Sequence, residues 1–269
     1  MNLNRTYGVE IEFIGDRESV AQAVREAGLD CSVEGYNHIT RPHWKITTDS
    51  SVRPTNSRQM QVGSGWELVS PILKGQDGFE QIKKVCEALK RTGAIVNKTC
   101  GLHVHHDARD FQTTTFKNII KIYKRFESTI DQLVAPSRRG NYNQYCRSLA
   151  GIDIERINEA TTLDAIRYTY GNRYHKLNLE SYITHGTVEF RQHQGTIDAD
   201  KIINWIKLTQ AMVQRAVDRP VRKGTAADWG TFKDYIFRNH APNNRQTTFS
   251  EDTKQLVKFY QKRIKELAA

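Results

Sequence analysis

Acidic and histidine side chains recur at alternate positions of three short apolar segments. The pairs are Glu10 and Glu12, His103 and His105, and Glu189 with Arg191. Because alternate residues of a β-strand face the same side, we expect three strands with an apolar rear face and a charged front face. Carboxylates crowded on one surface repel each other unless a cation lies among them. The spacing therefore predicts a metal site laid across a sheet.

A further carboxylate, Glu67, lies inside the apolar segment 65–70 and needs a cation or an arginine as partner if it is buried. Carboxylate oxygens joined by one or two imidazoles favour Mg²⁺ or Mn²⁺ over zinc, and four glutamates can carry two such ions. Paired ions of this kind typically bridge substrate phosphates. Arg191 beside Glu189 would then be placed to hold a phosphate oxygen. Taken singly, each pair also fits an ordinary ion pair or a buried histidine, so the prediction depends on their combination.

The composition limits the classes of partner. The net charge is +10 and the pI about 9.4, but lysines and arginines are scattered without a recognisable RNA motif, which disfavours nucleic-acid binding. No stretch approaches the roughly 20 apolar residues that a bilayer crossing needs, so we expect no membrane partner. The four cysteines form no Cys-x-x-Cys pair, which predicts a reduced, cytoplasmic protein without structural zinc.

The pattern of apolar residues predicts strands followed by mixed elements and a helical end. Strands are expected over 6–14, within 31–47, over 65–70, through the two histidines, and over 174–183 with a hairpin turn at Gly186 before Glu189. Helices are expected over 17–27 with Asp16 as N-cap, and over 78–92, 114–133, 153–171, 199–217, 228–239 and 250–267. A polar loop is expected over 136–141. This order predicts the α+β class with a mainly antiparallel sheet. We expect one catalytic domain, 1–269, with a core over 1–197 and a helical part over 198–269.

Five segments, in this order, resemble the family of putative amidoligases, which are carboxylate–amine ligases of the glutamine synthetase fold. They are Gly8–Glu12, Trp44–Ser51, Gly65–Pro71, Cys100–His105 and Thr187–Arg191. The resemblance implies a curved sheet like that of the glutamine synthetase catalytic domain, with a metal and nucleotide site on one face and helices on the other. It also implies an enzyme that joins a carboxylate to an amine through an acyl phosphate, using ATP and two or more Mg²⁺ or Mn²⁺ ions.

The resemblance assigns a role to each matched residue. The implied metal ligands are Glu10, Glu12, Glu67, His103 and Glu189; the implied cofactor-binding residues are His105, Arg191, Arg138 and Arg139; the implied catalytic residues are Arg191, Asp49 and Arg173. Asp49 would lie near the amine or its leaving proton. Asn178 is a further candidate for holding a carboxylate or phosphate, and His106 receives no role. Because the chain is shorter than glutamine synthetase, ammonia and free glutamate are not implied as substrates.

Two other functions stay open. A metal-dependent amide hydrolase would use the same glutamates and histidines, turn over without ATP and prefer zinc. A basic nucleic-acid-binding protein would show strongly salt-dependent binding and would tolerate the loss of Glu10 and Glu12. The residues name neither the carboxylate nor the amine, and they do not decide whether the chain forms a homo-oligomer.

Overall fold

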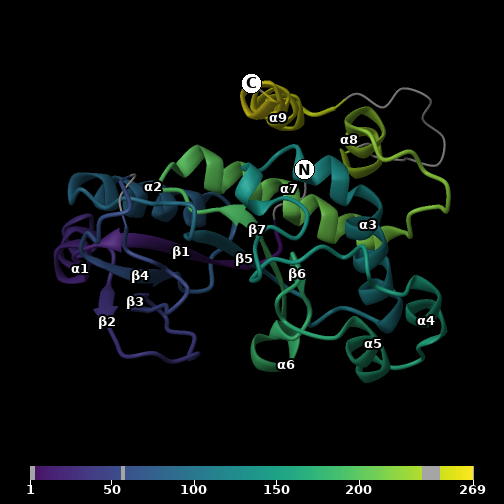
Figure 1. Ribbon diagram of the computed structural model, residues 1–269, viewed down its shortest axis with the longest axis horizontal. Helices are drawn as coiled ribbons and strands as arrows, with labels where there is room; N and C mark the ends of the chain where they lie inside the picture. Colours follow the sequence, from purple (N-terminus) through teal and green to yellow (C-terminus); the bar gives the residue numbers. More distant parts are fainter. Residues whose placement is uncertain (1–3, 56–57, 238–248, 269) are drawn as a thin grey trace. The chain divides into compact units, whose positions relative to one another are not determined.

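The computed structural model describes residues 4–55, 58–237 and 249–268, and it divides into two compact units (Figure 1). The sheet unit comprises residues 4–107 and 189–206, and the helical unit comprises the described residues of 108–188 and 207–269. That the two units act as one catalytic domain, with a core over 1–197, stays a prediction.

The strands of the sheet unit lie in the order β2-β3-β4-β1-β5-β7. Their bounds are β1 Tyr7–Gly15, β2 Cys31–Val33, β3 Trp44–Thr48, β4 Ser64–Val69, β5 Gly101–Asp107 and β7 Thr187–Gln194, of which the sheet unit holds the part from Glu189 onward. The pairs β3–β4, β4–β1 and β1–β5 are antiparallel, whereas β2 and β3 are parallel. The predicted mixture of helices with a mainly antiparallel sheet is confirmed.

An apolar rear face is built row by row from the strand register. One such row crosses four strands and consists of Ile46, Leu68, Ile11 and Leu102, all fully buried. The helices α1 (Arg17–Glu26) and α2 (Gly75–Arg91) cover this face (Figure 1). The indole of Trp44, which also points to the rear, donates a 3.0 Å hydrogen bond to Gln81 of α2. The front face is thereby left for polar side chains.

The helical unit is built around α3 (Thr113–Asp131), whose buried side includes Phe116, Tyr123 and Phe126. Its other elements are η1 Pro136–Arg138, α4 Ile154–Glu159, α5 Leu163–Tyr170, β6 Leu177–Asn178, α6 Ser181–His185, α8 Trp229–Phe237 and α9 Glu251–Ala268, and α7 (Ala199–Asp218) begins in the sheet unit. Among the described helices, none combines the length and the apolarity that crossing a membrane requires.

A buried ion cluster fastens α3 to the segments that follow it. The Lys176 ammonium donates hydrogen bonds of 2.6 Å to Oε1 of Glu127 and 2.6 Å to Oδ1 of Asp131. The second oxygen of Glu127 accepts from the Leu149 amide at 2.8 Å, and that of Asp131 accepts from the Gly140 amide at 3.0 Å. All four carboxylate oxygens therefore have a donor from within the unit.

The predicted strand over 174–183 and its hairpin turn are wrong. Only Leu177–Asn178 is extended as β6, and Ser181–His185 forms α6. The cause is local: the Asn178 carboxamide oxygen accepts from the Glu180 amide at 2.8 Å, which turns the chain out of the strand. Gly186 then ends the helix in the left-handed conformation, with φ of 67°.

The helical region predicted over 153–171 is divided into α4 and α5, and the other predicted elements are present with shifted ends. Asp16 caps α1 as expected, because its carboxylate accepts from the Ser19 amide at 2.8 Å. The helix predicted from residue 78 begins at Gly75, and the loop predicted over 136–141 opens with the single turn η1. The end of the helix predicted over 228–239 lies outside the described residues. The four cysteines are buried and form no disulfide in the part of the chain that the structure describes.

Candidate metal centre

Two strand pairings bring the predicted ligands onto the front face. Glu12 of β1 stands opposite Glu67 of β4, and Glu10 stands opposite His103 of β5. Residues paired across antiparallel strands project to the same side of a sheet. The alternation seen in the sequence therefore corresponds to one surface of the sheet unit. Glu12, His103 and Glu189 are almost fully buried on that surface, with 2%, 4% and 3% of their areas exposed.

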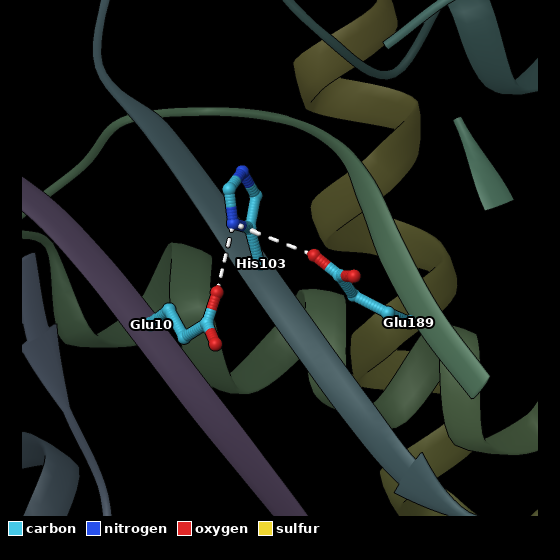
Figure 2. A group of neighbouring side chains, drawn as sticks. All are labelled: Glu10, His103 and Glu189. Atoms are coloured by element: carbon cyan, nitrogen blue, oxygen red, sulfur yellow. Dashed lines mark hydrogen bonds and ion pairs between the residues drawn. The ribbon is translucent and has the colours of Figure 1, made fainter. Parts of the chain in front are cut away.

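The first group of ligand atoms comes from Glu10, His103 and Glu189. One atom from each of these residues lies within 4.8 Å of the others. The Nδ1 atom of His103 is 3.0 Å from Oε2 of Glu10 and 3.5 Å from Oε1 of Glu189. Figure 2 shows the three side chains converging from β1, β5 and β7. A single cation between them would have two carboxylates and one imidazole as ligands.

The second group comes from Glu12, Glu67 and the same histidine, again with one atom of each within 4.8 Å of the others. The Nε2 atom of His103 lies 3.4 Å from Oε1 of Glu12. The other oxygen of Glu12 accepts a 2.6 Å hydrogen bond from the Gly101 amide, which fixes the carboxylate against the start of β5. His103 thus belongs to both groups, with a different ring nitrogen facing each.

The crowding of carboxylates on this surface affects the pKa of the Glu67 carboxyl. This pKa is raised well above its ordinary value because the side chain is buried and because Glu10, Asp49 and Glu12 add negative charge around it. A divalent cation at the second group would favour the ionised form and so oppose this shift. The contribution of Asp49 puts that residue in the same electrostatic environment as Glu67, and its expected place near the amine stays a prediction.

His105 and Arg191 carry positive charge beside the first group. Burial lowers the pKa of His105, but the negative charges of Glu10 and Glu189 outweigh it and raise the pKa above its ordinary value. The Nε2 atom of His105 lies 3.3 Å from Oε1 of Glu10. The guanidinium of Arg191 donates to Glu189, and the Glu189 pKa is lowered because the charges of Arg191 and His105 overcome the effect of burial.

The donor set fits a hard divalent cation. Each group offers two carboxylates and one imidazole, which is the ligand chemistry that Mg²⁺ or Mn²⁺ accepts, with water and substrate oxygens completing the shell. All the residues of both groups belong to the sheet unit. The five residues predicted as metal ligands are therefore together, and their role as ligands stays a prediction.

Comparison with known protein families decides where the chain belongs. The family described as "Putative amidoligase enzyme" matches residues 3–213, which is most of the chain. The chain belongs to this family. No curated protein matches this amidoligase-family chain in sequence.

Two solved structures are among those to which the amidoligase-family chain was found similar. A bifunctional glutathione synthetase from Pasteurella multocida is 11% identical with a TM-score of 0.43, and the match covers 99% of this chain but 45% of that one. A novel glutamine synthase homolog is 12% identical with a TM-score of 0.46, and the match covers 98% of this chain and 66% of that one. The chain thus spans less than half the length of the first structure.

The front face also holds two residues that the sequence analysis missed. The register pairs Lys45 with Val69, which in turn pairs with Glu10, and it pairs Thr47 with Glu67. Lys45 therefore stands in the row of Glu10 and His103, although it is almost fully buried. The alternation of Lys45 with Thr47 was visible in the sequence, but the pairing of β3 with β4 is needed to assign their face.

The three remaining arginines that were predicted as site residues have their own contacts. Arg138, Arg139 and Arg173 belong to the helical unit. Arg138 is buried with its guanidinium 3.9 Å from the Cys146 sulfur, and Arg139 donates to the carbonyls of Val134 and Leu267 at 3.1 and 3.2 Å. The bond of Arg139 to the C-terminal helix is a structural contact, and the binding roles predicted for the three arginines stay predictions.

Asn178, a further candidate, and His106, which had no predicted role, both have structural contacts. Asn178 is buried and uses its carboxamide oxygen to form the turn before α6. His106 points to the rear face, where its ring lies edge-on to Phe190 at 5.6 Å between centroids. Its pKa is lowered to about 3 because it is completely buried and lies near the positive charges of Arg5 and His105. A neutral core histidine accounts for the residue that had no predicted role.

Proposed function

We propose that the chain is an ATP-dependent ligase that joins a carboxylate to an amine, assisted by two divalent cations, Mg²⁺ or Mn²⁺. The observation that carries this proposal is the presence of two ligand groups on one sheet face, sharing His103. Membership of the amidoligase family supports the reaction class. The carboxylate and the amine would be identified by the pools that support ADP release.

The proposed reaction has two steps. An oxygen of the substrate carboxylate attacks the γ-phosphorus of ATP, a new P–O bond forms, and the bond to the leaving oxygen of ADP breaks. The amine nitrogen then attacks the carbonyl carbon of the acyl phosphate, a C–N bond forms, phosphate leaves, and the nitrogen releases a proton. Divalent cations, when bound, neutralise the phosphate oxygens and the charge that develops during transfer.

The chain's own residues would hold the reactants in line and stabilise charge. In this proposal the ligand groups around His103 hold the cations, and Glu10 and Glu12 belong to different ions. Arg191 carries five N–H donors, so a guanidinium held by Glu189 can also bind the transferred phosphoryl group. His105, whose pKa is raised, would face the nucleotide phosphates as a cation.

Asp49 would accept the proton of the amine in the second step. The motivation is its place among the charges that surround Glu67. In an Asp49→Asn variant, acyl phosphate should still form and be trapped by hydroxylamine, while amide formation with the amine slows. Equal rates of amide formation in the variant and the wild type would remove Asp49 from this role.

The proposal is tested by ADP release from the purified protein with Mg²⁺ and ATP, using pools of amino acids, peptides and amines. We expect release that requires both a carboxylate and an amine, and that falls about 100-fold or more in Glu12→Gln. The matched control is Glu87→Gln, a glutamate with 71% of its side chain exposed, which should leave the rate unchanged.

Two results would contradict the ligase. One is the absence of nucleotide turnover with every pool, together with no ATP binding by calorimetry in the presence of Mg²⁺ or Mn²⁺. The other is amide cleavage without ATP by a zinc-loaded protein, which would assign the same cluster to a hydrolase.

A further inference from the structure

The segment between β2 and β3 is hydrogen-bonded to side chains on the front side of β3. Thr47 and Lys45 point to the front by register, and both reach this segment. The Thr47 hydroxyl donates to the carbonyl of Gly35 at 3.2 Å. The Lys45 ammonium donates to the carbonyls of Asn37 and Ile39 at 3.1 and 2.8 Å. The backbone of residues 35–39 therefore lies over the front side of β3, next to the strand that carries Glu67, and we name residues 34–41 the front loop.

The ammonium of Lys45 is committed to this loop. Besides the two carbonyls, it donates to the side-chain oxygen of Asn37 at 2.8 Å. Its pKa is lowered, first by burial, while the negative charges of Glu34, Glu67 and Glu10 act in the opposite direction. Those charges show that the amine lies within electrostatic reach of the candidate metal centre. Two strand spacings, about 10 Å, separate the backbone of Lys45 from that of Glu10 in the same row.

The base of the front loop is closed by a bidentate ion pair. Arg41 donates from Nε to Oε1 of Glu34 at 3.0 Å and from Nη2 to Oε2 at 3.0 Å. Asn37 adds a 2.9 Å bond to Oε2, and Ser32 adds a 2.7 Å bond to Oε1. The hydrogen bonds from Arg41 are the main reason that the pKa of Glu34 is lowered to about 2. Paired charges of this geometry hold a loop in one conformation.

The front loop exposes apolar side chains at its tip, although its backbone is held by hydrogen bonds. Tyr36 and Ile39 are 63% and 54% exposed. The Tyr36 hydroxyl and the Nε2 atom of His38 are 2.9 Å apart, and the two rings lie edge-on at 5.0 Å between centroids. Single exposed apolar residues are common on proteins. Here the hydrogen bonds of Lys45 and Glu34 hold two of them in a loop over β3, and β3 is paired with β4, which carries Glu67. A rigid aromatic side chain at such a position binds a ligand at a low cost in conformational entropy.

We infer that Tyr36 and Ile39 contact the organic substrate, and that the substrate carries an aromatic or aliphatic group beside its reacting carboxyl or amine. Lys45 is a positioning residue for the front loop, because its ammonium holds the backbone of residues 37 and 39 against β3. The inference rests on the proposed function and deepens it, since it adds the substrate class. A small, fully polar amino acid would leave the tip of the loop without contact.

The experiment compares a Tyr36→Ala/Ile39→Ala variant with wild type on two matched substrate series. One series consists of small polar carboxylates and amines, and the other of counterparts bearing a phenyl or isobutyl group. We expect kcat/KM to fall about 10- to 100-fold for the apolar series, as loss of one buried apolar contact implies, with the KM for ATP unchanged. The matched control, Ile72→Ala, removes an isoleucine that is 63% exposed in the same unit and should leave both series unchanged.

A second variant tests the positioning role of Lys45. In Lys45→Met, we expect the KM for the organic substrate to rise while kcat and the KM for ATP change little, and Lys45→Arg should recover part of the loss. Chymotrypsin provides a readout that does not need activity. Cleavage after Tyr36 should be slow in the wild type and fast in Lys45→Met, because the loop is released from the sheet.

The possible outcomes separate the two proposals. If the wild type is an active ligase and the loop variant handles both series as the wild type does, the front loop has no part in specificity. The inference is also overturned if the loop variant has a higher KM for ATP but the same kcat/KM as the wild type on both substrate series. If the wild type releases no ADP with any pair, the ligase proposal fails first and the inference fails with it.

Discussion

The two buried charge clusters, one in each unit, differ in how their carboxylates are neutralised. In the helical unit, Lys176 and two backbone amides give a donor to each of the four oxygens of Glu127 and Asp131. On the front face of the sheet unit, four glutamates crowd around two imidazoles and the guanidinium of Arg191, and the pKa of Glu67 is raised as a result. The first cluster is balanced by the chain itself, and the second fits an added cation. Burial alone therefore does not distinguish a structural ion cluster from a binding site.

The largest effect is expected from breaking the balanced cluster. Lys176→Met should lower the free energy of unfolding by about 3–5 kcal/mol, because it leaves Glu127 and Asp131 buried without their shared cation. Urea unfolding followed by circular dichroism measures the change. Lys90→Met, which removes an exposed partner of Glu87, is the control. A loss no larger than that of the control would show that the cluster is not needed for stability.

The second expectation concerns the front-face cluster, which is the candidate metal centre. Mn²⁺ at about 100 times its Kd should raise the free energy of unfolding by about 2.7 kcal/mol. Thermal unfolding over a Mn²⁺ titration measures it. Glu10→Gln should lose most of this stabilisation, whereas Lys176→Met should keep it. Equal stabilisation of wild type and Glu10→Gln would place the ion elsewhere.

A smaller effect, of opposite sign to that of Lys176→Met, is expected on the front face. Because the folded state raises the pKa of Glu67, ionised Glu67 opposes folding, and its contribution to stability is lost as pH rises above the ordinary carboxyl pKa. Glu67→Gln should therefore stabilise the metal-free protein at pH 7, by less than the loss expected for Lys176→Met. The same variant should respond less to Mn²⁺. Destabilisation of the metal-free protein by Glu67→Gln would contradict the account of crowded carboxylates.

The last expected effect concerns His106 of β5, on the rear face. Burial lowers the pKa of His106 to about 3, so the unfolded chain binds an additional proton between that pH and about 6.5. Stability should fall as pH decreases below about 6.5, by at most about 1.4 kcal/mol per pH unit from this group. His106→Leu should have a flatter dependence in urea unfolding at pH 7 and pH 5. Parallel curves for the two proteins would exclude His106 as a source of acid sensitivity.

Much of the candidate site could be predicted because its signal is local. Spacing alone shows that Glu10 and Glu12 share a face, and the same holds for His103 and His105. Alternate residues of a strand face the same side whatever the order of strands in the sheet. The predicted apolar rear face is seen in the burial of Ile11 and Leu102.

Other features depend on pairings that the sequence does not display. The face of Lys45 follows from the register of β3 on β4, and the partners of Lys176 lie 45 and 49 residues away. The failed strand over 174–183 has a different cause. Ile183 and Thr184 favour a strand by propensity, but the turn formed by Asn178 starts a helix before they are reached.

His103 makes the two ligand groups compete. Its Nδ1 faces Glu10 at 3.0 Å and its Nε2 faces Glu12 at 3.4 Å, but a neutral imidazole has one ring lone pair and one N–H. When one ion takes the lone pair, the other group meets an N–H and must bind its ion through carboxylates and water. Two cations bound as proposed would consequently differ in affinity, and the group facing the lone pair would fill before the other.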